Sequence, residues 1–216
     1  MADRRDRWAC GHRLAGQAIS RLKFKSSGGE GAIVSALIPP ETFHSERLLL
    51  RRPEMRDAPA MFDGWAQDIE ALRYLSWQPH GSVAQAESHI ARCEAAWLDG
   101  SAYIHFLVER TTNRVVGSLA SRVDEHGVNF GYVLRQDGWG RGFMAEALRP
   151  VSTWWLEQGG AHRTWATCHT ANVQSVRVLE KAGFTLEGTL RRWGSNPNVS
   201  PDPCDHFCYS RVRGAS

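Results

Sequence analysis

The chain has 216 residues, of which 42% are hydrophobic and 10% aromatic, a composition typical of a globular domain and not of a disordered chain. Its longest apolar run, residues 32–38, ends at Pro39 and is far shorter than the roughly 20 residues that span a bilayer, so we expect no membrane-spanning segment. The formal net charge is +3, but residues 1–40 hold seven basic and three acidic side chains, so the remainder is nearly neutral and we expect no nucleic-acid or membrane partner.

Residues 1–42 differ in composition from the rest of the chain. They are first rich in arginine, then in serine and glycine, and they end near Pro39 and Pro40 with no sustained periodicity. We predict a basic, disordered leader over 1–42 and one domain over 43–213. A disordered arm, a weak organellar-type leader and a translation start placed too far upstream remain open as explanations of this segment.

The cysteines do not indicate a disulfide framework or a metal site. Their count of five is odd, and no secretory signal precedes them, so we expect a cytoplasmic protein. Cys204 and Cys208 flank His206, but their spacing matches no standard zinc pair and no second pair exists elsewhere. We therefore expect no metal.

The domain begins with a strand and two helices. Residues 46–52 form a short strand-like run that Pro53 closes, and Asp57 is placed to cap a helix that continues to about Gln67. A second helix has a capping-box pattern at Ser82 and Gln85, an apolar stripe of Ala86, Ile90, Cys93 and Trp97, and a stop signal at Gly100.

Alternating residues then predict three consecutive antiparallel strands, which are followed by alternating helices and strands. The strands span about 102–110, 115–122, 128–134, 163–170, 184–191 and 206–213, with helices at 143–157 and 172–182. This order predicts an α/β (α+β) fold with one mixed, mostly antiparallel sheet of about seven strands and helices on both faces.

A glycine-rich turn, Gly138, Gly140 and Gly142, separates the strand at 128–134 from the next helix. Backbone N–H groups at a helix N-terminus are unpaired and favour anions, and glycine lets the backbone approach a pyrophosphate closely. The GK(S/T) sequence of a P-loop is absent, and the turn follows three antiparallel strands, so a Rossmann dinucleotide site fits poorly. A tight turn without a ligand remains the structural alternative.

Six segments, in this order and spacing, together resemble the GNAT superfamily of acyl-CoA-dependent N-acetyltransferases. More closely, they resemble its RimJ/RimL-like branch, which acetylates the N-terminal alanine or serine of ribosomal proteins. The segments are Glu46–Arg51, Arg73–His80, Gly131–Leu134, Trp139–Leu148, Asn172–Ser175 and Glu180–Gly188. The resemblance covers about residues 44–213 and implies a central pair of parallel strands, 128–134 and 163–170, that splay apart at their ends.

The resemblance also implies how acetyl-CoA would be bound. Pantetheine would enter between the splayed strands and bond to the backbone near Val133 and Leu134, and Asn172 would hold the cofactor from the other side. The pyrophosphate would lie on the loop and the helix start. The loop residues expected to bind it are Gly138, Trp139, Gly140, Arg141, Gly142, Phe143 and Met144.

Direct acetyl transfer needs a neutral amine, a donor for the carbonyl oxygen and a proton for the leaving thiolate. Many members of the superfamily have a tyrosine seven residues after the asparagine, where this chain has Leu179, and the RimL-like branch implies Ser175 as the acid instead. A serine that bonds to its own helix backbone is the alternative reading of Ser175. The N–H of Val133 or Leu134 is the expected donor for the carbonyl oxygen.

No strong general base is visible. The acid that some members carry at the position of Asn129 is absent, and His80, His105 and His169 are candidates only by residue type. A terminal α-amine has a pKa near 8 and is partly neutral already, which favours it over a lysine side chain.

The resemblance places the acceptor beside the aromatic segment that precedes the second helix. We expect Tyr74, Trp77 and His80 to bind the acceptor, although core packing explains Trp77 equally well.

The sequence thus predicts transfer of acetyl from acetyl-CoA to a primary amine, most simply a protein N-terminal α-amine of the Ala or Ser type. A ribosomal protein is one candidate acceptor, and a monomer or a homodimer is expected. Acetylation of a polyamine, an aminoglycoside or another small amine is one alternative. A non-catalytic sensor that binds acyl-CoA is another.

Overall fold

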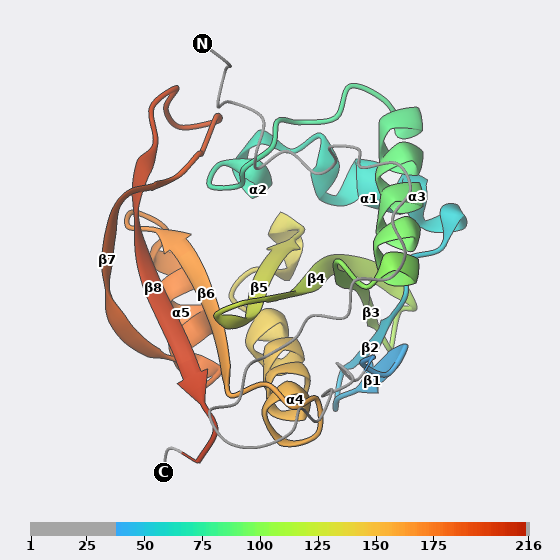
Figure 1. Ribbon diagram of the computed structural model, residues 1–216. Coiled ribbons are helices and arrows are strands. Elements are labelled where there is room, and N and C mark those ends of the chain that lie inside the picture. Colours follow the sequence, from blue (N-terminus) through green and yellow to red (C-terminus); the bar gives the residue numbers. More distant parts are fainter. Residues whose placement is uncertain (1–37, 215–216) are drawn as a thin grey trace.

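The computed structural model of the chain describes residues 38–214 (Figure 1). Most of the predicted leader therefore lies outside the described residues. Across residues 38–214, eight strands form one sheet in the order β1-β2-β3-β4-β5-β6-β8-β7. Every neighbouring pair is antiparallel except β5 with β6. None of the helices in this range has the length and apolarity needed to cross a bilayer.

The strands and helices have the following bounds. The strands are β1 (Thr42–His44), β2 (Leu48–Arg51), β3 (Tyr103–Glu109), β4 (Arg114–Asp124), β5 (Gly127–Leu134), β6 (Arg163–His169), β7 (Thr185–Gly194) and β8 (Cys204–Val212). The helical segments are η1 (Met55–Asp57), α1 (Ala58–Met61), η2 (Phe62–Ala66), α2 (Ile69–Leu72), α3 (Val83–Asp99), η3 (Gln136–Gly138), α4 (Phe143–Glu157) and α5 (Val173–Lys181).

The fold class expected from the sequence is confirmed, with one strand more than expected. The additional strand is β1, which pairs with β2 at the edge of the sheet. It has three residues, and only Phe43 is buried, so it is too short to show an alternating pattern.

The first predicted helix differs from the expectation. Residues 55–66 form a 3₁₀ turn, one α-helical turn and a π-helical segment in succession, and the Asp57 side chain makes no cap hydrogen bond to the helix that follows it. Its carboxylate instead accepts two hydrogen bonds of 2.7 Å from the Arg51 guanidinium and one from the Glu54 N–H. A buried carboxylate is stabilised more by a bidentate arginine than by a cap, so Asp57 ties this segment to β2.

The second predicted helix is confirmed as α3. Its stripe of Ala86, Ile90, Cys93 and Trp97 is buried, and Gly100 ends it with a left-handed φ of 74°. The capping box expected at its start is not formed. The Ser82 side chain makes no cap hydrogen bond, and the Gln85 side chain accepts from the Gly81 N–H.

The sheet separates two hydrophobic cores, because successive side chains of a strand point to opposite faces. On β3, Phe106 belongs to the core covered by α1, η2, α2 and α3, whereas Leu107 belongs to the core covered by α4 and α5. Helices therefore cover both faces of the sheet, as expected.

The parallel strands β5 and β6 pair only at their first residues. Val128 lies opposite Thr164 and Asn129 lies opposite Trp165, and no further register pair joins the two strands among the described residues. Beyond these pairs the strands diverge toward the ends from which α4 and α5 continue (Figure 1). The splayed pair expected in the sequence is confirmed, and it leaves a wedge in the middle of the sheet.

His105 lies in the core and not at the wedge. Its side chain is 0% exposed, packs edge-on against Phe43 and Trp97, and donates from Nε2 to the Pro40 carbonyl at 3.0 Å. Burial lowers its pKa to about 4. The residue therefore stays neutral in the folded protein at pH values where the unfolded chain would bind a proton.

This burial predicts a pH-dependent stability. Because the pKa of His105 is lower in the folded state than its ordinary 6.5, its contribution is complete above pH 6.5 and decreases as the pH falls toward 4. Replacing His105 by Gln keeps a donor for Pro40 but removes the titration. We expect the loss of unfolding free energy between pH 7 and pH 4.5, measured by denaturant titration, to be smaller by about 2 kcal/mol in His105→Gln. An equal loss in both proteins would contradict this assignment.

Candidate functional site

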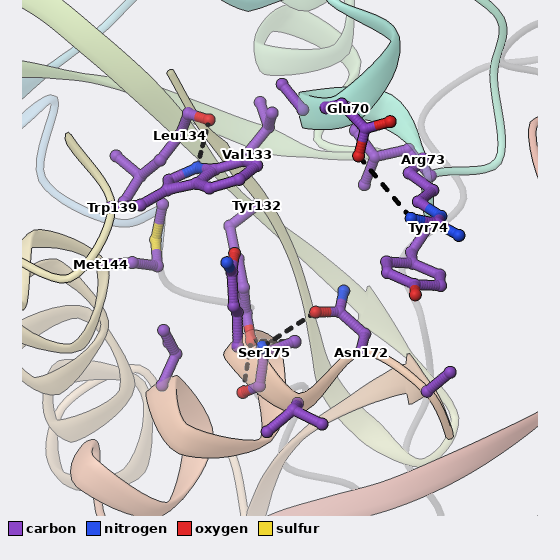
Figure 2. Close-up of a pocket in the computed structure, with 16 residues that line it drawn as sticks. Glu70, Arg73, Tyr74, Tyr132, Val133, Leu134, Trp139, Met144, Asn172 and Ser175 are labelled. Carbon is purple, nitrogen blue, oxygen red and sulfur yellow. Dashed lines mark hydrogen bonds and ion pairs between the residues drawn. The ribbon is translucent and has the colours of Figure 1, made fainter. Parts of the chain in front are cut away.

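A pocket of about 300 Å³ lies where β5 has diverged from β6, between the end of β5 and the start of α5 (Figure 2). The end of β5, the loop before α4, the segment around α2 and the start of α5 form its walls. Seven of the site residues expected from the sequence line it: Tyr74, Val133, Leu134, Trp139, Met144, Asn172 and Ser175. Segments that lie about 100 residues apart in the chain therefore meet at one place.

The edge of β5 that faces the wedge has backbone groups without a strand partner. In an antiparallel ladder, alternate residues direct both N–H and C=O toward the neighbouring strand. The Arg135 N–H donates to Val116 on β4, so Val133 also faces β4 and Leu134 faces the wedge. The Trp139 indole N–H donates to the Leu134 carbonyl at 3.0 Å, which leaves the Leu134 N–H directed into the wedge. Of the two N–H groups expected from the sequence, that of Leu134 has the required direction.

The glycine-rich loop has the backbone conformation that only glycine adopts without strain. Gly140 and Gly142 have φ values of 72° and 80°, in the left-handed region. The Glu146 N–H donates to the Gly142 carbonyl, which is the first hydrogen bond of α4. The N–H groups of residues 143–145 therefore have no carbonyl acceptor within the helix. This is the arrangement in which a helix N-terminus can bind an anion.

Charged side chains fix this loop to the rest of the domain. Arg141 forms an ion pair with the buried Glu109 of β3, whose carboxylate also accepts from the Thr112 hydroxyl. The hydrogen bond from Thr112 and the nearby Arg141 hold the pKa of Glu109 below its usual value. The guanidinium groups of Arg47 and Arg141 both lie over the ring of Phe143, which is fully buried.

Five loop residues expected to bind the cofactor do not line the pocket themselves, although they lie between residues that do. They are Gly138, Gly140, Arg141, Gly142 and Phe143.

Asn172 and Ser175 form the opposite wall of the pocket at the start of α5. The Asn172 side-chain oxygen accepts from the Ser175 N–H at 3.0 Å, so Asn172 caps the helix and keeps its amide NH₂ for another partner. The Ser175 Oγ lies 2.7 Å from the Tyr132 hydroxyl (Figure 2). Ser175 is nearly buried and its hydroxyl faces the strand across the wedge.

Tyr132 also lines the pocket, although no motif assigns it an individual role. It lies on β5 with Phe130 and Leu134, whose side chains point to the same face of the sheet. Burial raises the pKa of Tyr132 above its usual value, although the hydrogen bond with Ser175 lowers it in part. Alternation along β5 could have placed the side chain on this face, but the partner on α5 depends on how the helix packs.

The acceptor wall expected from the sequence is only partly brought to the pocket. Tyr74 lines it, together with Glu70 and Arg73, which the sequence analysis did not single out. Trp77 and His80 do not line it. Their rings stack at 5.0 Å on the side of the sheet covered by α3.

The loop between β7 and β8 holds this wall in place. The Asn196 amide donates to the Tyr74 carbonyl at 2.7 Å, and the Asn198 amide donates to the carbonyls of Leu72 and Trp77 at 2.8 Å. His206 Nε2 donates to the Asn196 side-chain oxygen at 2.8 Å. These contacts between distant segments have no signal in the sequence.

No histidine lines the pocket in residues 38–214. Of the three candidate bases, His169 contacts a pocket residue, since the centroid of its ring lies 4.9 Å from that of Tyr74. Its Nδ1 accepts from the Ala171 N–H at 3.0 Å, so the neutral ring carries its proton on Nε2. Burial and Arg73 lower the pKa of His169. The described part of the chain also contains no group of three or more His, Cys, Asp or Glu side chains that could hold a metal.

Comparison with known proteins matches the chain to a protein family. Residues 47–185 match the family model described as an acetyltransferase (GNAT) domain. The uncharacterized N-acetyltransferase p20 of Bacillus licheniformis is 30% identical over 154 residues, which are 70% of this chain and 86% of the relative. The [ribosomal protein uS5]-alanine N-acetyltransferase of Escherichia coli is 25% identical over 160 residues, which are 70% and 81% of the two chains.

Solved structures agree with the fold. The microcin C7 self-immunity acetyltransferase MccE, in complex with acetyl-CoA and AMP, superposes with a TM-score of 0.72 at 20% identity, covering 81% of this chain and 98% of that one. The family model spans more than half of the chain and includes β5, the glycine-rich loop and α5, which form the pocket. The chain therefore belongs to the GNAT acetyltransferase family and is an N-acetyltransferase.

Proposed function

We propose that the protein transfers an acetyl group from acetyl-CoA to the α-amine of a protein N-terminus, of the Ala or Ser type. The observation that carries this proposal is the convergence of three groups on one wedge: the Leu134 N–H, the Ser175 hydroxyl and the first turn of α4. The acetylation of ribosomal protein uS5 by a relative supports the choice of acceptor.

In this proposal the wedge binds acetyl-CoA in an extended form. The unpaired edge of β5 would bond the pantetheine amides in place of a strand, and the Asn172 NH₂ would bond it from α5. The pyrophosphate would lie on the N–H groups of residues 140–144, where two left-handed glycines keep side chains away. Because these donors are backbone groups, substitutions that add a Cβ test the site better than removal of charge does.

The reaction follows from the groups at the wedge. The neutral amine nitrogen attacks the thioester carbon, and the Leu134 N–H stabilises the negative charge that develops on the carbonyl oxygen. The C–N bond forms and the C–S bond breaks with its electron pair on sulfur. Ser175 donates its proton to that thiolate, and a proton released by the amine returns to Ser175 through water, so that amide and thiol are the products.

The choice of acceptor rests on the absence of a histidine base from the described residues that line the pocket. A lysine amine with a pKa near 10.4 requires a base at neutral pH, whereas an α-amine with a pKa near 8 is already partly neutral. Among the described residues that line the pocket, Glu70 is the one with an acidic side chain. This side chain is exposed to solvent and forms an ion pair with Arg73. The site therefore suits an amine that needs little deprotonation.

The test of this function is amine-dependent thiol release from acetyl-CoA. We expect release with short peptides that begin with Ala or Ser, and none with the same peptides when the α-amine is blocked and a lysine is present. Polyamines and aminoglycosides complete the panel. Release with those small amines alone would refute the proposed acceptor, and acetyl-CoA binding without release on any amine would favour a sensor.

The loop assignment predicts the effect of a side chain at Gly142. In Gly142→Val, a β-branched residue at a φ of 80° forces the loop to shift, so the N–H groups lose their direction. We expect the Kd for acetyl-CoA, measured by calorimetry, to rise at least about tenfold. Gly100→Val is the matched control, because Gly100 has a φ of 74° at the end of α3, away from the pocket. A rise in Kd in both variants, or in neither, would contradict the assignment.

The acid assignment predicts a loss of turnover with intact binding. In Ser175→Ala the thiolate has no proton donor, so we expect kcat to fall about 100-fold while the Kd for acetyl-CoA changes little. Ser88→Ala is the matched control, since Ser88 is also a helix serine but bonds to the Ala84 carbonyl in α3. Unchanged kcat in Ser175→Ala would show that the proton comes from elsewhere.

A further inference from the structure

We propose that Tyr132 is a positioning residue for acetyl transfer: its phenol O–H donates to the Ser175 Oγ and thereby turns the Ser175 hydrogen toward the sulfur of acetyl-CoA. This inference rests on the proposed role of Ser175 as proton donor. It gives Tyr132 a function that no sequence motif indicates.

The geometry makes Tyr132 the hydrogen-bond partner of the Ser175 hydroxyl. The two oxygens are 2.7 Å apart, whereas the Tyr132 oxygen is 3.5 Å from the Ser175 carbonyl. Both side chains line the pocket, one from β5 and one from α5, so the bond joins the strand to the helix (Figure 2). It fixes the distance between the strand and the helix at the place where the sulfur would lie.

A helix serine otherwise satisfies its hydroxyl within its own helix. Ser88 donates to the Ala84 carbonyl at 2.9 Å in α3, and Ser152 donates to the Arg149 carbonyl at 3.1 Å in α4. In both, the hydrogen points along the helix and is not available to a ligand. The phenol beside Ser175 offers that hydroxyl a partner outside its helix.

Both hydroxyls of this pair keep their protons at working pH, and the 2.7 Å distance allows either one to donate. We take the phenol as the donor because it is the more acidic hydroxyl, and its burial keeps it protonated. Burial likewise raises the pKa of the neighbouring Cys168 thiol to about 11, so this group also stays protonated. With the phenol as donor to one lone pair of Oγ, the Ser175 hydrogen is left to point into the pocket.

This bond becomes stronger during the reaction. As Ser175 gives its proton to the thiolate, negative charge develops on Oγ, and a hydrogen bond to a charged oxygen is roughly twice as strong as one to a neutral oxygen. An interaction that strengthens in the transition state affects kcat and leaves ground-state binding nearly unchanged. Loss of the Tyr132 hydroxyl should therefore reduce turnover and not acetyl-CoA affinity.

The experiment is a double-mutant cycle with Tyr132→Phe, Ser175→Ala and the double variant, assayed by thiol release from acetyl-CoA with the best amine of the panel. We expect Tyr132→Phe to lower kcat about tenfold with KM for acetyl-CoA within about twofold. The double variant should be no slower than Ser175→Ala alone, because Tyr132 acts only through that hydroxyl. Melting temperatures establish that each variant is folded.

A matched control separates this role from the general loss of a buried hydroxyl. Tyr103→Phe makes the same change at another buried tyrosine, which packs against Trp97 and Trp155 away from the pocket, and should leave kcat unchanged. Wild-type kcat in Tyr132→Phe, or multiplicative losses in the double variant, would overturn the inference while leaving the proposed function intact. Absence of amine-dependent release in the wild-type protein would overturn both.

Discussion

The divergence of β5 from β6 is the constraint on which the site depends. A strand inside a sheet normally pairs its backbone on both edges, and an unpaired buried N–H or C=O is costly. Here the two strands pair only through Val128–Thr164 and Asn129–Trp165, so the following residues of β5 need other partners on that edge. The Trp139 indole satisfies the Leu134 carbonyl, which leaves an N–H for a ligand.

Each side of the wedge continues directly into a helix, and this gives the two walls different chemistry. After β5 the chain passes through Gly140 and Gly142 into α4, whose first turn presents backbone donors. After β6 it passes through Asn172 into α5, which presents polar side chains. Backbone donors and polar side chains thus lie on opposite walls, and the Tyr132–Ser175 bond joins the two walls.

The predictable elements were those with local physical signals. α4 has the expected bounds, Phe143–Glu157, because it starts after a glycine-rich turn and ends before two glycines, and α3 ends at Gly100 as expected. The prediction of one continuous helix that Asp57 caps was wrong, because the Asp57 carboxylate binds Arg51 on a neighbouring strand. Strand β1 was missed because it has three residues, too few for a period.

The order of strands and helices, the glycine-rich loop and the residues at the start of α5 were predictable from the amino-acid sequence. These follow from periodicity, caps and left-handed turns, which depend on neighbours within a few residues. The packing of the folded chain was needed to see that Leu134 faces the wedge, that Tyr132 bonds to Ser175, and that Asn196 holds the Tyr74 segment while Trp77 and His80 pack elsewhere. The Tyr132–Ser175 and Asn196–Tyr74 contacts join residues 43 and 122 positions apart, and they depend on how distant segments pack on a splayed sheet, which no local pattern specifies.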